Sequence, residues 1–159
     1  RGLLAGLAYI HARNIAHRDV KAENILLGPD DRAVLVDFGS ATADANTALV
    51  KMCGSPGYCA PEVILGVPYT IRVDSFSAGV VLYFILCGRK PFSAKSFRDV
   101  LQKTLKGKVI FKRHVQFEAV SEDCKKLISA LLVVRPETRL TAEEALTHPW
   151  FGGQPKNNP

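Results

Sequence analysis

Three short motifs, in a fixed order and with short gaps, constrain this chain more than any other feature of its sequence. Residues 17–24 read HRDVKAEN, residues 37–39 read DFG and residues 60–62 read APE. One such tripeptide would carry little information, whereas all three in this order are very unlikely to arise by chance. They gather Asp, Asn and Lys side chains that suit a magnesium ion and phosphate groups.

These motifs are signatures of protein kinases. Over residues 1–151 the chain resembles the C-terminal lobe of a eukaryotic-type protein kinase, with residues 152–159 as a tail or linker. The resemblance implies a mainly α fold, in which a helical lobe carries a small antiparallel hairpin with the catalytic and D-F-G loops. A kinase domain also has a glycine-rich loop and an upstream lysine, and residues 1–16 contain neither. We therefore expect a fragment that lacks its N-lobe and is inactive alone.

Apolar periodicity and turn residues also predict the individual elements. Residues 1–12 follow a helical pattern, and apolar runs at 25–27 and 34–36 flank a turn, which predicts a hairpin. Residues 38–58 have no clear period and are predicted to form a loop.

Further helices are expected over residues 73–87, from Ser93 or Ala94 to Lys106, from Ser121 and from Thr141. The helix over 73–87 is apolar on nearly all faces, so we expect it to be buried all round. The next helix should bury one face. Its members are Phe97, Val100, Leu101 and Leu105.

The resemblance implies a catalytic role for several residues of the motifs. Asp19 would accept or orient the substrate hydroxyl, and Lys21 would contact the transferred phosphate of ATP. The hydroxyl of Ser55 can bridge these two side chains. Asn24 and Asp37 are oxygen donors suited to Mg²⁺, which takes few protein ligands and completes its shell with nucleotide phosphates.

Other positions match binding residues of the same family. Leu26 should form the floor under the adenine of ATP. Glu23 and Gly57 are expected at the protein-substrate site, where Glu23 can receive an arginine of the substrate. Phe84 stands where some kinases carry a second acid, so half of that acidic pair is absent.

A further set of residues is expected to hold this machinery in place. Glu62 and Arg139 resemble an ion pair that ties the activation segment to the lobe. Asp74 resembles the acid that holds the backbone of the catalytic loop, and a buried carboxylate needs such amide partners. His17 and Phe38 resemble members of a hydrophobic column that links the two lobes.

Three segments narrow the resemblance to the calcium/calmodulin-dependent kinase group. They are residues 53–58 (CGSPGY), 86–92 (LCGRKPF) and 142–151 (AEEALTHPWF). This group implies protein substrates and, as a partner, calmodulin or a calcium-sensing regulatory segment. No EF-hand loop occurs in the chain, so calcium control is inferred from the group alone.

Control by phosphorylation is a separate question. Arg18 resembles the arginine that in many kinases grips a phosphothreonine, and the usual phosphothreonine position falls on Lys51. Alternatively, the loop is shifted and Thr42 or Thr47 takes the phosphate. We favour the reading in which Lys51 occupies the phosphothreonine position. We therefore expect a kinase that is switched mainly by release of an autoinhibitory segment beyond Pro159, and not by phosphorylation of this loop.

Composition excludes several other classes. The net charge is +6, but the basic residues are dispersed, which favours a solvated face over a nucleic-acid site. The longest apolar stretch, residues 78–87, is far shorter than the ~20 residues that span a bilayer. The four cysteines have no metal-ligand spacing and suit a reducing compartment, so we expect a cytoplasmic or nuclear protein.

Three functions compete on this evidence. The first is a Ser/Thr protein kinase that uses ATP and Mg²⁺, and the second is a pseudokinase or docking scaffold without catalysis. The four intact motif residues Asp19, Lys21, Asn24 and Asp37 favour the enzyme. A small-molecule phosphotransferase fits poorly, because it would not need the A-P-E segment that shapes a protein-substrate site.

Overall fold

The computed structural model describes residues 1–43, 49–50 and 53–152. Two short strands, β1 (Ile25–Leu27) and β2 (Ala33–Leu35), form an antiparallel hairpin. The described helices are α1 (Gly2–His11), α2 (Pro61–Ile64), α3 (Arg72–Cys87), α4 (Phe97–Lys106), α5 (Glu122–Leu131), α6 (Ala142–Leu146) and α7 (Pro149–Gly152). Short 3₁₀ turns cover Ala22–Asn24, Phe38–Ser40, Val115–Glu118 and Pro136–Thr138. The predicted fold class, mainly α with one small antiparallel hairpin, is confirmed.

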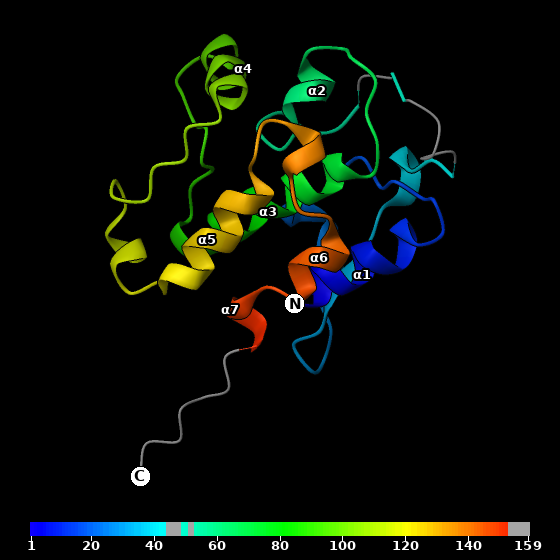
Figure 1. Cartoon of the computed structure of the whole chain (residues 1–159), viewed down its shortest axis with the longest axis horizontal. Helices are drawn as coiled ribbons and strands as arrows, with labels where there is room; N and C mark the ends of the chain where they lie inside the picture. Colours follow the sequence, from blue (N-terminus) through cyan, green and yellow to red (C-terminus); the bar gives the residue numbers. More distant parts are fainter. Residues whose placement is uncertain (44–48, 51–52, 153–159) are drawn as a thin grey trace.

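Helix α3 runs through the middle of the molecule, with α5 along one side and α1 near its start (Figure 1). Helix α6 packs against α1. Gly79 allows the close approach of α5, because a Cβ atom at this position would lie 2.8 Å from Cβ of Leu131. All residues from 73 to 81 are buried, so this part of α3 is the centre of the hydrophobic core.

The prediction that α3 is buried all round is wrong for one face of its C-terminal half. The side chain of Ile85 is 65% exposed, and Leu82 is only partly covered. Both line a small apolar cavity together with Trp150 and Phe151. Apolar composition shows that a helix can be buried, but it does not show which faces its neighbours cover.

Helix α4 differs from its prediction in two respects. It begins at Phe97 rather than at Ser93 or Ala94, because the hydroxyl of Ser96 caps it by accepting from the amide of Asp99 at 3.1 Å. The predicted core face is only partly right, since Val100, Leu101 and Leu105 are half-buried beside the buried Thr104, whereas Phe97 is 61% exposed. The helix packs on α2 rather than on the central core.

The remaining elements follow the sequence closely. The second strand lies one residue earlier than predicted, with Ile25 opposite Leu35. Helix α5 is capped by Ser121, and Thr141 with Glu144 forms the expected capping box of α6.

No helix among the described residues has both the length and the apolar character needed to cross a membrane.

The segment after the D-F-G motif is irregular where it is described. Ala16 pairs with Thr42 and Leu49 pairs with Tyr69 through isolated β-bridges. These two contacts tie the beginning and the middle of the segment to the lobe.

Candidate active site

Three side chains meet beside the start of the hairpin. The ammonium of Lys21 lies 2.7 Å from Oδ2 of Asp19 and donates to Oγ of Ser55 at 3.1 Å. The hydroxyl of Ser55 donates to Oδ1 of Asp19 at 2.8 Å. Ser55 therefore bridges Asp19 and Lys21, as the sequence predicted, and we call these three residues the Asp19 cluster. The side chains of Asp19 and Lys21 are 13% and 21% exposed, so the cluster is ordered but open to a ligand.

The environment keeps this pair ionised. Partial burial alone would raise the pKa of Asp19, but hydrogen bonds from Lys21 and Ser55 outweigh it and hold the pKa below its ordinary value. The hydrogen bond with Asp19 raises the pKa of Lys21, and the carboxylates of Glu23 and Asp37 raise it further. A carboxylate and an ammonium thus persist side by side at neutral pH.

Asn24 and Asp37 sit at the two ends of the hairpin. Asn24 closes the turn before β1, is buried, and donates through Nδ2 to the carbonyl of Asp19 at 3.0 Å and to its Oδ2 at 3.3 Å. Both bonds use Nδ2, and within the described part of the chain no partner is found for the amide oxygen. Asp37 follows β2 in a left-handed conformation, with φ of 63°, and its Oδ1 accepts from the amide of Gly39 at 3.2 Å.

This donor set suits magnesium rather than a protein-enclosed metal. An amide oxygen and a carboxylate oxygen are hard donors, and Mg²⁺ takes only one or two such protein ligands beside nucleotide phosphates. Among the described residues no group of three or more His, Cys, Asp or Glu side chains could hold a metal ion. The residues present therefore fit an ion that arrives with its phosphates.

Asp74 on α3 anchors the backbone of the catalytic loop. Its Oδ2 accepts from the amide of His17 at 2.8 Å and its Oδ1 from the amide of Arg18 at 2.7 Å. This arrangement matches the prediction. His11 was missed, although its Nε2 lies 2.8 Å from Oδ2 of Asp74. Three contacts with one buried carboxylate fix the loop that carries Asp19.

The ring of His17 continues this support towards the hairpin. Its Nε2 contacts the carbonyl of Val36 at 3.0 Å, and the ring meets Phe38 edge to face at 4.9 Å. The two rings are therefore in contact, and their place in a column that links two lobes stays a prediction. Phe38 and Leu26 are 48% and 56% exposed, which leaves apolar surface on the hairpin side of the cluster.

The Glu62–Arg139 pair is present and fully enclosed. Arg139 has no exposed area and binds Glu62 through two hydrogen bonds of 2.6 and 2.9 Å. Its other donor groups bind the carbonyls of Val133, Val134 and Arg72. Arg72, which sequence reasoning missed, donates in return to the carbonyl of Arg139. A reciprocal contact of this kind has no local sequence signal.

The predicted substrate residues lie on adjoining segments. Burial raises the pKa of Tyr58, and the nearby carboxylate of Glu23 adds to this effect. Gly57 has φ of 82°, and a Cβ atom there would lie 3.1 Å from the side chain of Lys90. Lys90 was not predicted. Its ammonium donates to the carbonyl of Pro56 at 3.2 Å and lies 4.0 Å from the ring centre of Tyr58.

Arg18 is engaged with the lobe in this structure. Its Nε donates to the carbonyl of Ser40 at 2.6 Å, and its backbone is left-handed with φ of 67°. Burial raises the pKa of Tyr69 to about 12, and the guanidinium of Arg18 opposes that rise. Lys51 and Thr47, which carried the prediction about loop phosphorylation, lie outside the described residues.

Comparison with known proteins agrees with this geometry. The family model for the protein kinase domain matches residues 1–151. The chain is 43% identical over 159 residues to the calcium/calmodulin-dependent protein kinase cmkA of Emericella nidulans, covering 97% of this chain and 38% of that protein.

Two animal proteins give a similar result. Identity is 35% over 156 residues with the calcium/calmodulin-dependent protein kinase type 1 of Caenorhabditis elegans, covering 96% of this chain and 44% of that protein. It is 36% over 159 residues with the type IV kinase of Mus musculus, covering 98% and 34%. The chain thus spans less than half the length of each of these three relatives. With the motifs, the Asp19 cluster and the match over residues 1–151 taken together, the chain belongs to the protein kinase domain family.

Proposed function

We propose that the full-length protein transfers the γ-phosphoryl group of ATP to serine and threonine hydroxyls of other proteins. The Asp19 cluster carries this proposal, because its ionised carboxylate is in contact with the oxygen donor Asn24 and its ammonium lies within electrostatic range of Asp37. Phosphoryl transfer needs positioning and charge neutralisation more than covalent chemistry from the protein.

Each member of the cluster has a distinct role in this reaction. Oδ1 and Oδ2 of Asp19 orient the attacking hydroxyl and accept its proton. The ammonium of Lys21 neutralises charge on the transferred phosphate, which it can do because hydrogen bonding to Asp19 keeps it protonated. Ser55 fixes the positions of the Asp19 and Lys21 side chains through hydrogen bonds of 2.8 and 3.1 Å.

The nucleotide and its metal would sit on the hairpin side of this cluster. Asn24 and Asp37 would hold Mg²⁺, which when bound neutralises charge on the phosphate oxygens. The exposed side chain of Leu26 offers apolar surface for the adenine ring. Lys21 and Ser55 support serine and threonine, rather than tyrosine, as the accepting residues, since Ser/Thr kinases carry this pair of functional groups.

One experiment tests the reaction and its acceptor together. The full-length protein is incubated with Mg-ATP and three peptides that differ only in a Ser, Thr or Tyr target. We expect transfer to serine and threonine and none to tyrosine. Asp37→Ala should abolish transfer with little loss of fold, because this side chain is exposed and packs on nothing in the core. Near-wild-type turnover in that variant contradicts the proposal, and no transfer by the wild type favours a non-catalytic scaffold.

We also infer calcium/calmodulin control through an autoinhibitory segment elsewhere in the full-length protein. The inference is supported by the similarity to the calcium/calmodulin-dependent kinases and by Lys51, which cannot be phosphorylated as threonine can. Replacing Thr42 and Thr47 together by Ala should leave kcat/KM within tenfold when the activator is present. A larger loss, more than about 1.4 kcal/mol of transition-state stabilisation, would assign the switch to these threonines.

A further inference from the structure

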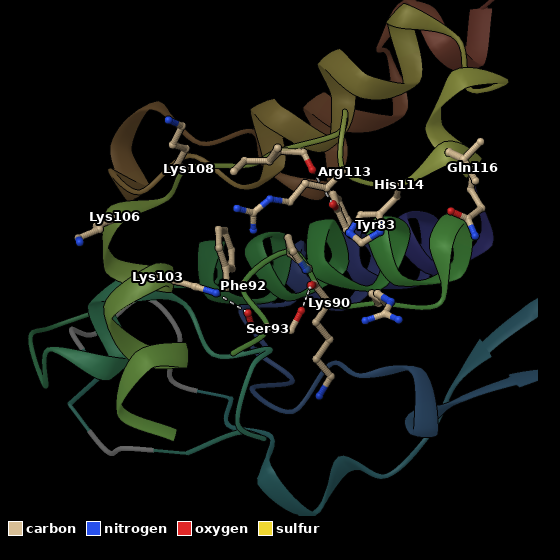
Figure 2. Close-up of a pocket in the computed structure, with 14 residues that line it drawn as sticks. Tyr83, Lys90, Phe92, Ser93, Lys103, Lys106, Lys108, Arg113, His114 and Gln116 are labelled. Atoms are coloured by element: carbon tan, nitrogen blue, oxygen red, sulfur yellow. Dashed lines mark hydrogen bonds between the residues drawn. The ribbon is translucent and has the colours of Figure 1, made fainter. Parts of the chain in front are cut away.

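A basic cavity lies beside the segment that holds the predicted substrate residues. Its volume is about 860 Å³, and it is lined by the end of α3, the loop before α4, one face of α4 and the loop that follows α4. We call it the α3–α4 cavity. Figure 2 shows Arg113 reaching from the loop after α4 towards the side of the cavity where Lys103 and Lys106 lie.

The lining of the α3–α4 cavity is strongly one-sided in charge. It contains no Asp or Glu and six basic residues, namely Arg89, Lys90, Lys103, Lys106, Lys108 and Arg113. Among the described residues, none of the six forms an ion pair with a carboxylate. A concave site with one sign of charge concentrates the opposite charge at its surface. This charge suits an anionic ligand.

The floor of this cavity is preorganised. Tyr83 is buried and donates to the carbonyl of Ile110 at 2.8 Å, and its ring lies 6.1 Å from that of His114. Phe92 is also buried and stacks on Phe76. The ammonium of Lys103 is held by the carbonyl of Ser93 at 2.7 Å. A ligand would thus meet a formed surface rather than a mobile one.

The position of Lys90 connects this cavity to the substrate segment. Its side chain lines the cavity, while its ammonium binds the carbonyl of Pro56 and lies over the ring of Tyr58. Residues 55–58 include Ser55, which binds Asp19, and Gly57, which packs on Lys90. Lys90 is therefore shared by the cavity and by the segment that carries Ser55.

We propose that the α3–α4 cavity is a docking subsite for an acidic or phosphorylated segment of the protein substrate, next to the residue that is phosphorylated. This rests on the proposed kinase function. The subsite selects by charge, through Arg113 and the other basic residues of the lining (Figure 2), and adds to any contact that Glu23 makes with a basic residue. The substrates it favours carry both a basic and an acidic element around the target.

A peptide fits this site better than a nucleic acid does. The basic residues gather in one concave patch, whereas a nucleic acid needs a track along which several phosphates are bound. The lining also contains the apolar side chains of Pro91, Ile110 and Val115, which suit a peptide chain. Single-stranded RNA is therefore a comparison ligand in the test and not the proposed one.

The test uses the full-length protein and a set of matched peptides. A reference peptide carries one target serine. Extended peptides add a short cluster of glutamates or of phosphoserines, each tested before and after the target. We expect at least one extended peptide to have kcat/KM about tenfold above the reference, as a few exposed ion pairs would produce, chiefly through a lower KM. The gain should shrink as salt is raised.

A charge-reversal double variant and a matched control double variant show whether the gain in kcat/KM arises in the α3–α4 cavity. In Lys108→Glu/Arg113→Glu the ratio of kcat/KM between extended and reference peptides should fall to about one. Lys95→Glu/Lys112→Glu changes the net charge equally, in exposed residues close by that do not line the cavity, and should keep the wild-type ratio. A wild-type ratio near one, or a ratio that survives Lys108→Glu/Arg113→Glu, overturns the proposal.

A separate binding measurement distinguishes this proposal from the proposed function. Fluorescence anisotropy of the labelled extended peptide needs no turnover. If no peptide is phosphorylated, the kinase proposal fails. The docking proposal then stands if Lys108→Glu/Arg113→Glu weakens peptide binding more than the control pair does, and it fails if the two pairs weaken binding equally. Tighter binding of single-stranded RNA than of a peptide of equal charge also overturns the docking proposal.

Discussion

Two charged clusters in this chain use similar groups in opposite ways. Arg139 and Glu62 are enclosed, and Arg139 donates to Glu62 and to three backbone carbonyls, so that all its donor groups are occupied. Asp19 and Lys21 are held by hydrogen bonds on one side and remain open on the other. The first pair connects α2, α3 and the segment before α6, whereas the second can still bind a ligand.

The two pairs differ in how deeply they are buried and in whether their hydrogen-bonding groups remain available to a ligand. A buried pair is costly to break, because the remaining partner is left as an uncompensated charge. A partly exposed pair contributes about 0–1 kcal/mol to stability, so its members can be selected for chemistry instead. We therefore expect mutations in the enclosed pair to act on folding and mutations in the open cluster to act on turnover.

The largest effect on folding is expected for Arg139→Ala. This change leaves Glu62 buried without a partner and three carbonyls without their donor, at a cost of about 3–5 kcal/mol in unfolding free energy. Urea denaturation of the full-length protein measures the loss. Arg135→Ala, an exposed arginine nearby, is the matched control and should change stability by less than about 0.5 kcal/mol. Equal midpoints for the two variants would contradict the distinction.

A moderate effect on turnover is expected for Ser55→Ala. Loss of the hydroxyl removes the bridge between Asp19 and Lys21, and kcat/KM should fall by about tenfold, or about 1.4 kcal/mol. Ser55→Thr keeps the hydroxyl and should retain most of the activity. Steady-state kinetics with one peptide compares the three proteins. If the threonine variant is as impaired as the alanine variant, the hydroxyl is not the functional group.

The smallest expected effect is a pH dependence of stability. The folded pKa of Asp19 lies below its unfolded value of 3.8, so the ionised carboxylate stabilises the fold above that pH. The stability that wild type gains over Asp19→Asn should be present above pH 4 and should disappear as the pH falls through the folded pKa. Urea denaturation of both proteins between pH 7 and pH 3 measures this difference. A gain that increases on acidification would mean that the pKa is raised instead.

Much of the candidate site could be predicted because its residues belong to compact motifs. Asp19, Lys21 and Asn24 are close in sequence, and the short hairpin returns the chain to Asp37. The distant partners Ser55 and Asp74 followed from the kinase resemblance and not from spacing.

The unpredicted features depend on tertiary packing. His11 ends an ordinary amphipathic helix, so nothing near it in sequence indicates its contact with Asp74. The apolar pattern of α4 shows one face, but the position of α2 decides that Thr104 is buried and Phe97 is not. The charge along the chain is dispersed, and only folding brings Arg89 and Arg113 to one cavity.

The most direct test of this account measures activity and stability together in Asp19→Asn. The amide keeps the shape of the carboxylate but cannot accept the proton of the substrate hydroxyl, and a general base typically contributes about 10²- to 10⁴-fold to the rate. We predict that kcat of the full-length protein falls by at least about 10²-fold, while the unfolding free energy changes by less than about 1 kcal/mol. Retained turnover, or a loss of stability as large as that of Arg139→Ala, would contradict the assignment of Asp19 to catalysis.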